Sequence, residues 1–191
     1  MRVDIVLIST FVLVPSLVFA ADYNVPEGGT LAKAIAEANA NKDGDMYEIE
    51  ISGTSADSGN VKNSASIAGN PSAVLSGSLA FNGTGIRSEI SNLTFTSGTV
   101  GAVANGTLGL GEAQDLTITS VAFEQRNGNG YGGGVVNLGN MTIQGNSSFS
   151  GNRADVGGAI YNSKRLDISD TSFLNNTASG SGGAIDRKSV V

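Results

Sequence analysis

A repeat of 25 residues in the C-terminal half constrains the fold of this chain more than any other feature of its sequence. Two columns of apolar residues recur at this spacing: Leu116, Met141 and Leu166, and Ile118, Ile143 and Ile168. A period between about 20 and 50 residues is typical of a solenoid, in which each repeat buries its apolar face against its neighbour. The sequence therefore predicts a stack of similar turns.

The pattern inside each repeat predicts β-strands. Apolar and polar residues alternate in Leu116-Thr117-Ile118 and in the two copies that follow, as they do along strands. Glycine pairs recur at the same step of 25 residues, at positions 132–133, 157–158 and 182–183. Short strands between Gly, Asn and Ser corners suit one rung of a β-helix. We therefore predict an all-β fold, a right-handed parallel β-helix.

Corner residues have predicted structural roles in this repeat. Gly158 and Gly183 are expected to provide either a positive φ or a close approach of two backbones. Asn152 and Asn176 are expected to bond to the backbone and to the Asn of the next rung. Inward Leu, Ile, Phe and Val are expected to stack on their equivalents about 4.8 Å away.

The rest of the chain divides into three segments. Residues 1–21 combine Arg2, an apolar stretch from Ile5 and small residues at 20 and 21, which is typical of a secretory signal peptide. Residues 22–52 are predicted to form an N-terminal cap, an amphipathic helix followed by a first strand over 47–51, which covers the open end of the solenoid. Residues 53–115 are predicted to form about two irregular rungs, before the regular rungs of 116–191.

Composition excludes several classes of function. The chain holds 17 acidic and 11 basic residues, a net charge of −6, and no basic stripe that could neutralise phosphates, so nucleic acid is not an expected partner. It has no Cys and no His, which removes thiol chemistry and the commonest general base and metal ligand. It also has no Trp, so sugar-stacking rings would have to be Tyr or Phe. No cofactor and no metal site are expected.

Two repeated motifs carry a family resemblance. Gly157-Gly-Ala-Ile160 and Gly182-Gly-Ala-Ile185 alternate with Phe149-Ser-Gly-Asn152 and Phe173-Leu-Asn-Asn176. These segments resemble the GGA(I/L/V) and FxxN repeats of the chlamydial polymorphic outer membrane proteins. The preceding rung departs from the pattern, because Gly132-Gly-Gly-Val135 replaces GGAI and 123–127 reads as FxxN with one extra residue. Residues 29–39 are similar to the opening of bacterial SLREAI-type β-helix proteins.

The resemblance implies a function as well as a fold. Those outer membrane proteins are autotransporters whose β-helical passenger is displayed outside the cell as an adhesin, so it implies export to the outer membrane surface or the extracellular space. It implies attachment to a host-cell receptor or glycan. Its candidate adhesion residues are Phe149, Asn152, Gly157, Gly158, Ala159, Ile160, Phe173, Asn176, Gly182, Gly183, Ala184 and Ile185. The same residues are also what a rung needs to turn and stack, and exposed loops between them could bind instead.

Two other functions remain open at this stage. Pectate lyases and related enzymes share the fold, and their chemistry needs clustered carboxylates with Ca²⁺ or a neighbouring base. The candidates are Asp155, Asp167 and Asp170, with Arg153, Lys164 and Arg165. Thr142 and Gly145 are expected below Asp167 and Asp170, so no carboxylate ladder is predicted, and no catalytic residue is assigned. A passive stalk is the third alternative.

The position of the last residue suggests a partial product. The next rung should open 25 residues after Leu166, at Val191. We therefore expect further rungs and a C-terminal membrane barrel in a complete protein, and self-association through the open end of the β-helix without them.

Overall fold

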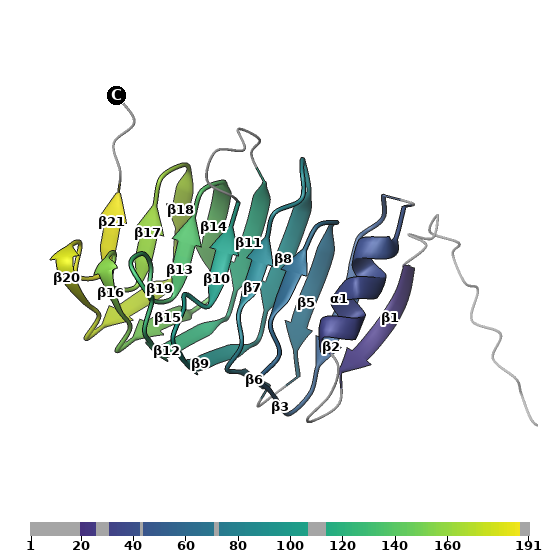
Figure 1. Cartoon of the computed structure of the whole chain (residues 1–191), viewed down its shortest axis with the longest axis horizontal. Coiled ribbons are helices and arrows are strands. Elements are labelled where there is room, and N and C mark those ends of the chain that lie inside the picture. The colour runs from purple at the N-terminus through teal and green to yellow at the C-terminus, as the bar shows by residue number, and fades with distance from the viewer. Residues whose placement is uncertain (1–19, 26–30, 43, 71–72, 107–113, 188–191) are drawn as a thin grey trace, which may run out of the picture.

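The computed structural model, which describes residues 20–25, 31–42, 44–70, 73–106 and 114–187, confirms the predicted β-helix (Figure 1). Parallel strands wind into three sheets, and each turn contributes one strand to each sheet. Sheet A consists of β1 (Ala20–Val25), β2 (Tyr47–Ile51), β5 (Ala65–Gly69), β8 (Arg87–Ser91), β11 (Asp115–Thr119), β14 (Asn140–Gln144) and β18 (Leu166–Ile168).

The other two long sheets close the turns. Sheet B consists of β3 (Thr54–Ser55), β6 (Val74–Leu75), β9 (Thr94–Gly98), β12 (Ala122–Arg126), β15 (Ser147–Ser150) and β19 (Thr171–Leu174). Sheet C consists of β4 (Gly59–Val61), β7 (Leu79–Phe81), β10 (Val103–Asn105), β13 (Val135–Asn137), β17 (Ile160–Asn162) and β21 (Ile185–Arg187). A short sheet D pairs β16 (Arg153–Val156) with β20 (Thr177–Ser181).

The register follows the sequence repeat. Leu116 pairs with Met141, and Met141 pairs with Leu166, so the column seen in the sequence is a ladder across β11, β14 and β18. Alternate residues of β14 are buried, as expected for strands with one face in the core. Between residues 53 and 115 the same three-sheet winding continues through β5–β7 and β8–β10, with Ile67 paired to Ile90 and Ile90 to Ile118.

A column of aromatic rings runs through the interior under sheet B. Phe95, Phe123, Phe149 and Phe173 stack with centroid separations of 5.2, 4.5 and 5.0 Å and nearly parallel planes. The sequence separations between them vary, and the corners absorb the difference. Because Phe95, Phe123 and Phe149 are fully buried, this ladder is a large part of the apolar core.

A second ladder, made of asparagines, lies at the end of sheet C. The side-chain amide of Asn105 donates to Oδ1 of Asn137 at 3.0 Å, and that of Asn137 donates to Oδ1 of Asn162 at 2.7 Å. The amide of Asn137 also donates to the carbonyl of Arg165 at 2.8 Å. All three side chains are buried, so each satisfies the backbone at a corner that water does not reach.

The two glycines of the GGAI motif have different roles. Gly157 has φ 67°, so the first glycine makes the left-handed turn. A Cβ on Gly158 would overlap the carbonyl oxygens of Gly183 and Thr177, so the second glycine permits the close approach of two rungs. Of the two alternatives left open by the sequence, close approach is therefore correct for Gly158.

Arg126 corrects the expectation that the rung at 123–127 contains an extra residue. Phe123 pairs with Phe149 and Asn127 pairs with Arg153, so Arg126 occupies the place of Asn152. Its N–H donates to Asn152 Oδ1 at 3.1 Å, as the N–H of Asn152 donates to Asn176 Oδ1 at 3.0 Å. The motif therefore has its usual length, with Arg in place of Asn.

The guanidinium of Arg126 lies inside the solenoid. The residue is 1% exposed, and it donates to the carbonyls of Ser76, Thr96 and Val100 at 2.8, 3.0 and 2.9 Å. Burial lowers its pKa below the usual value for arginine. The group fits because its partner across the ladder is Gly98, where a Cβ would overlap the guanidinium.

The N-terminal end is covered by a helix, as predicted. Helix α1 (Leu31–Ala40) lies beside β1 at the purple end of Figure 1, and it buries Leu31, Ala34, Ile35 and Ala38 against the first rung. The predicted signal peptide falls mostly outside the described residues. Tyr23–Val25 of β1 pair regularly with β2, and the register is irregular between Ala20 and Tyr23.

The C-terminal rung has a neighbour on one side only within the described residues. Strands β18, β19 and β21 stand at the ends of their sheets, and Ile168, Leu174 and Ile185 are exposed there. Val191 lies outside the described residues, and self-association through this end stays a prediction. Over the described ranges, no helix has the length and apolar character that a membrane span requires.

The two second glycines of the GGAI motifs make a matched pair for mutation. Gly158→Ala should lower the free energy of unfolding by about 1–3 kcal/mol, because the added methyl overlaps backbone that cannot move aside. Gly183→Ala should cost less than about 0.5 kcal/mol, because its Cβ would meet only Asn176 O, at 3.6 Å. Urea denaturation of both variants measures the difference, and equal losses would show that Gly158 is not a close-approach position.

The Gly98–Arg126 contact is tested by a double-mutant cycle. Gly98→Ala should destabilise the parent chain by about 1–3 kcal/mol. In an Arg126→Asn background the same substitution should cost less, with a coupling energy of at least about 0.5 kcal/mol, because the guanidinium no longer fills the space. Arg153→Asn, a change at an exposed arginine, is the matched control and should add independently. An equal cost of Gly98→Ala in all backgrounds would contradict the contact.

Candidate functional site

The candidate adhesion residues divide between an interior and a terminal rung. In the first copy, Phe149, Asn152, Gly157, Gly158, Ala159 and Ile160 are all buried. In the second copy, Phe173, Asn176, Gly182 and Ala184 are partly buried, and Gly183 and Ile185 are exposed. A receptor could therefore reach the second copy in this structure, but not the first without local opening of the rung.

The buried positions explain themselves by packing and hydrogen bonding. The amide of Asn152 donates to the carbonyl of Phe123 at 2.9 Å and to Asn176 Oδ1 at 2.9 Å. The amide of Asn176 in turn donates to the carbonyl of Phe149 at 2.9 Å. Each FxxN asparagine thus joins its own rung to the one before, which is a structural role.

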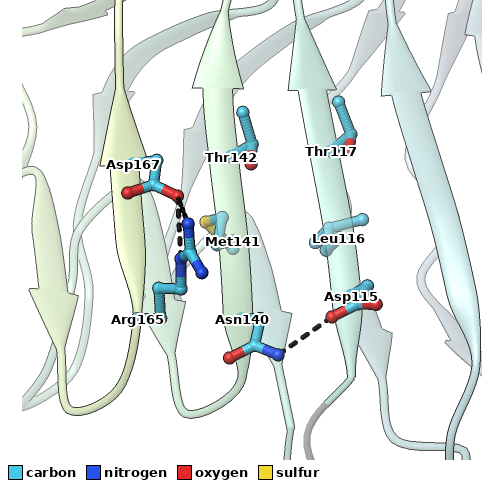
Figure 2. Close-up of a pocket in the computed structure, with 8 residues that line it drawn as sticks. All are labelled: Asp115, Leu116, Thr117, Asn140, Met141, Thr142, Arg165 and Asp167. Atoms are coloured by element: carbon cyan, nitrogen blue, oxygen red, sulfur yellow. Dashed lines mark hydrogen bonds and ion pairs between the residues drawn. The ribbon is translucent and has the colours of Figure 1, made fainter.

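The outer face of sheet A carries a polar surface that spans three rungs. Asp115 pairs with Asn140 at the start of β11 and β14, and Arg165 stands at the equivalent place before β18. One residue further out in each strand, Thr117 pairs with Thr142 and Thr142 with Asp167. We call these six residues the sheet A strip. Figure 2 shows them projecting from the three strands around a shallow pocket of about 170 Å³.

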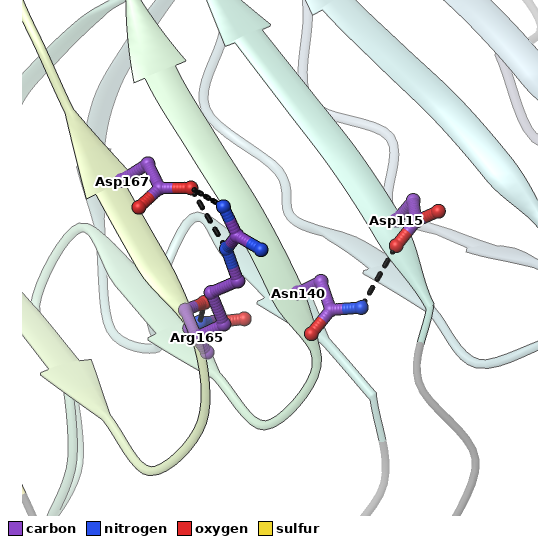
Figure 3. A network of polar contacts seen from close by, with 5 residues as sticks. Asp115, Asn140, Arg165 and Asp167 are labelled. Atoms are coloured by element: carbon purple, nitrogen blue, oxygen red, sulfur yellow. Dashed lines mark hydrogen bonds and ion pairs between the residues drawn. The ribbon is translucent and has the colours of Figure 1, made fainter.

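Hydrogen bonds order the side chains of the sheet A strip. The amide of Asn140 donates to Asp115 Oδ1 at 2.9 Å. Nε and Nη2 of Arg165 both contact Asp167 Oδ2, at 2.9 and 2.8 Å (Figure 3). Because Arg165 and Asp167 are exposed, this ion pair contributes little to stability. Its consequence is geometric, since it leans the guanidinium along the strand and leaves donors and acceptors side by side.

The carboxylates considered for catalysis do not come together. Asp167 is paired with Arg165, and Asp155 accepts a hydrogen bond from Ser179 at 2.8 Å in sheet D. Asp170 lies at a corner with φ 46°. Thr142 lies in the rung below Asp167, as predicted. Among the described residues, no three Asp or Glu side chains are placed to hold a metal ion.

The sheet A strip was not recognised as a site from the sequence, although part of its pattern was visible. Asp115, Asn140 and Arg165 recur at the 25-residue spacing, each directly before an apolar strand residue. Charge changes along this column, from acid to amide to base, so it lacks the chemical likeness of the inward columns. Only the strand register shows that the three side chains are neighbours.

The family comparison supports the resemblance seen in the motifs, while no curated protein and no solved structure shows a significant match to the chain. Residues 140–163 and 170–186 match the family model of the Chlamydia polymorphic membrane protein repeat. The first segment covers β14 to β17, and the second covers β19 to β21. Such repeats indicate an outer membrane passenger of the autotransporter type. These two rungs are therefore repeats of the Chlamydia polymorphic membrane proteins, a family of non-enzymatic outer membrane proteins.

Proposed function

We propose that the chain is an adhesin-like passenger, displayed on the outer membrane surface or released from it, that attaches to a host-cell receptor or glycan. The observation that carries this proposal is the sheet A strip, a polar and solvent-facing surface on rungs that match the family repeat. Its donors and acceptors are ordered by mutual hydrogen bonds, so little side-chain entropy is lost when a partner binds.

The repeat motifs contribute to attachment indirectly in this proposal. The FxxN and GGAI residues of the interior rung are buried and join successive turns. They keep β11, β14 and β18 in register, and that register places Asp115, Asn140 and Arg165 in one column. Direct contact of a receptor with motif residues is then confined to exposed positions such as Gly183 and Ile185.

A polysaccharide lyase fits the site less well. Lyase chemistry needs a carboxylate cluster or a metal with a free base beside the substrate. Arg165, the base nearest to the pocket, is engaged with Asp167. A passive stalk would need no ordered surface pocket, and this favours the adhesin over the stalk.

Attachment is tested by removing the polar groups of the strip. Binding of the purified chain to cultured epithelial cells should fall about tenfold, or about 1.4 kcal/mol, in the double variant Asn140→Ala, Arg165→Ala. Arg153→Ala, at an exposed arginine of β16 outside the strip, should bind within about twofold of the parent. All chains should keep the same unfolding midpoint, because the removed side chains are not in the core.

Three outcomes would overturn this proposal. Equal binding by the parent and the strip variant would remove the strip from attachment. No binding by the parent chain would favour the passive stalk. Release of unsaturated uronides from pectin by the purified chain would favour the lyase.

A further inference from the structure

A second surface, on the outer face of sheet C, has a different chemistry from the sheet A strip. A groove of about 300 Å³ lies over β7, β10 and β13. Its floor is formed by Ala80, Ala104 and Val136, which pair with one another across the three strands. Val100 and Tyr131 line it from the loops that precede β10 and β13, and they are 50% and 51% exposed. Its dimensions and apolar lining are those of a small-ligand site.

The walls of this groove are anchored to the solenoid. The carbonyl of Val100 accepts a hydrogen bond from the buried guanidinium of Arg126 at 2.9 Å. On the opposite side, Tyr131 forms a parallel bridge with Val156, whose carbonyl accepts from the N–H of Gly132 at 3.0 Å. Both exposed side chains therefore stand on fixed backbone, and the groove is formed before any ligand binds.

Tyr131 gives the groove an exposed aromatic ring. The phenylalanines from Phe81 to Phe149 are buried, and Tyr47 and Tyr161 are no more than 9% exposed. The ring of Tyr161, in the next rung of sheet C, supports that of Tyr131 at a centroid distance of 4.7 Å and a tilt of 51°. A supported ring with half its surface in water can stack against a flat apolar group.

The lining selects against charged ligands and against peptides. None of the residues that line the groove is Asp, Glu, Lys or Arg, so nothing there would compensate a ligand charge. Its strands β7, β10 and β13 are each paired on both sides, so an extended peptide could not add to the sheet at this place. Polar groups stand at the margin, in Ser78 and Asn129.

We propose that this groove binds an uncharged glycan, with the C–H face of one pyranose ring stacked on Tyr131. The C–H groups carry partial positive charge and pack against the negative face of the ring. The hydroxyls of the sugar reach Ser78 and Asn129 at the margin, and the short floor residues Ala80 and Ala104 leave room for the ring. The groove lies on a different sheet from the sheet A strip and does not depend on the adhesin proposal.

The probes for this site are maltotetraose, cellotetraose and chitotetraose, with trigalacturonate as the charged comparator. Saturation-transfer NMR and calorimetry with the full purified chain should detect at least one of the three neutral sugars, and bind trigalacturonate at least about tenfold more weakly. Tyr131→Ala should weaken the bound neutral sugar about tenfold or more, and Tyr131→Phe should retain binding within about threefold.

Leu174→Ala is the matched control, because Leu174 is an apolar side chain, 60% exposed, on β19. It should leave the affinity for sugar unchanged. The proposal fails if none of the neutral sugars binds, if Tyr131→Ala binds as the parent does, or if Leu174→Ala weakens binding equally. It also fails if the chain forms a dimer in sedimentation that Tyr131→Ala dissociates, because the groove would then be covered by a second copy.

Discussion

The hydrogen bonds between parallel strands of successive rungs are the interaction on which the rest of this structure depends. They hold each turn in register with the next, so one residue of every rung stands on its equivalent in the rung before. Inside the solenoid this produces columns of Phe and Asn side chains. On the outside it brings together residues that are far apart in the chain, and both candidate binding surfaces arise in this way.

Arg126 shows how a single departure from the repeat can serve another part of the molecule. In the next two rungs its place is taken by Asn152 and Asn176, which bond to the backbone of the preceding rung. The longer arginine reaches further, to the carbonyls of Ser76, Thr96 and Val100. It costs desolvation of a cation, which the three carbonyls offset in part. In return it orders the loop that carries Val100, one wall of the groove on sheet C.

The fold could be predicted because its determinants are periodic. Leu116, Met141 and Leu166 are chemically alike and equally spaced, and so are the glycine pairs, since both sets face a constant environment. Arg126 could not be placed, because its fit depends on Gly98, whose rung is longer. The strip residues Asp115, Asn140 and Arg165 are equally spaced but chemically unlike, and the exposure of Tyr131 depends on a loop without periodicity. Residues that face solvent escape the stacking constraint, so their roles need the three-dimensional register.

The same register makes each outer site the property of several rungs. The sheet A strip takes Asp115, Asn140 and Arg165 from three successive turns, and the groove on sheet C takes Ala80, Ala104 and Val136 from three as well. The overlap is one rung, that of β11 to β13, which contributes to both surfaces. Loss or gain of a whole 25-residue repeat would leave the inward columns continuous, because every rung offers them the same kind of residue. It would bring different outward residues side by side, so a chain of this kind can change what it binds without changing what holds it together.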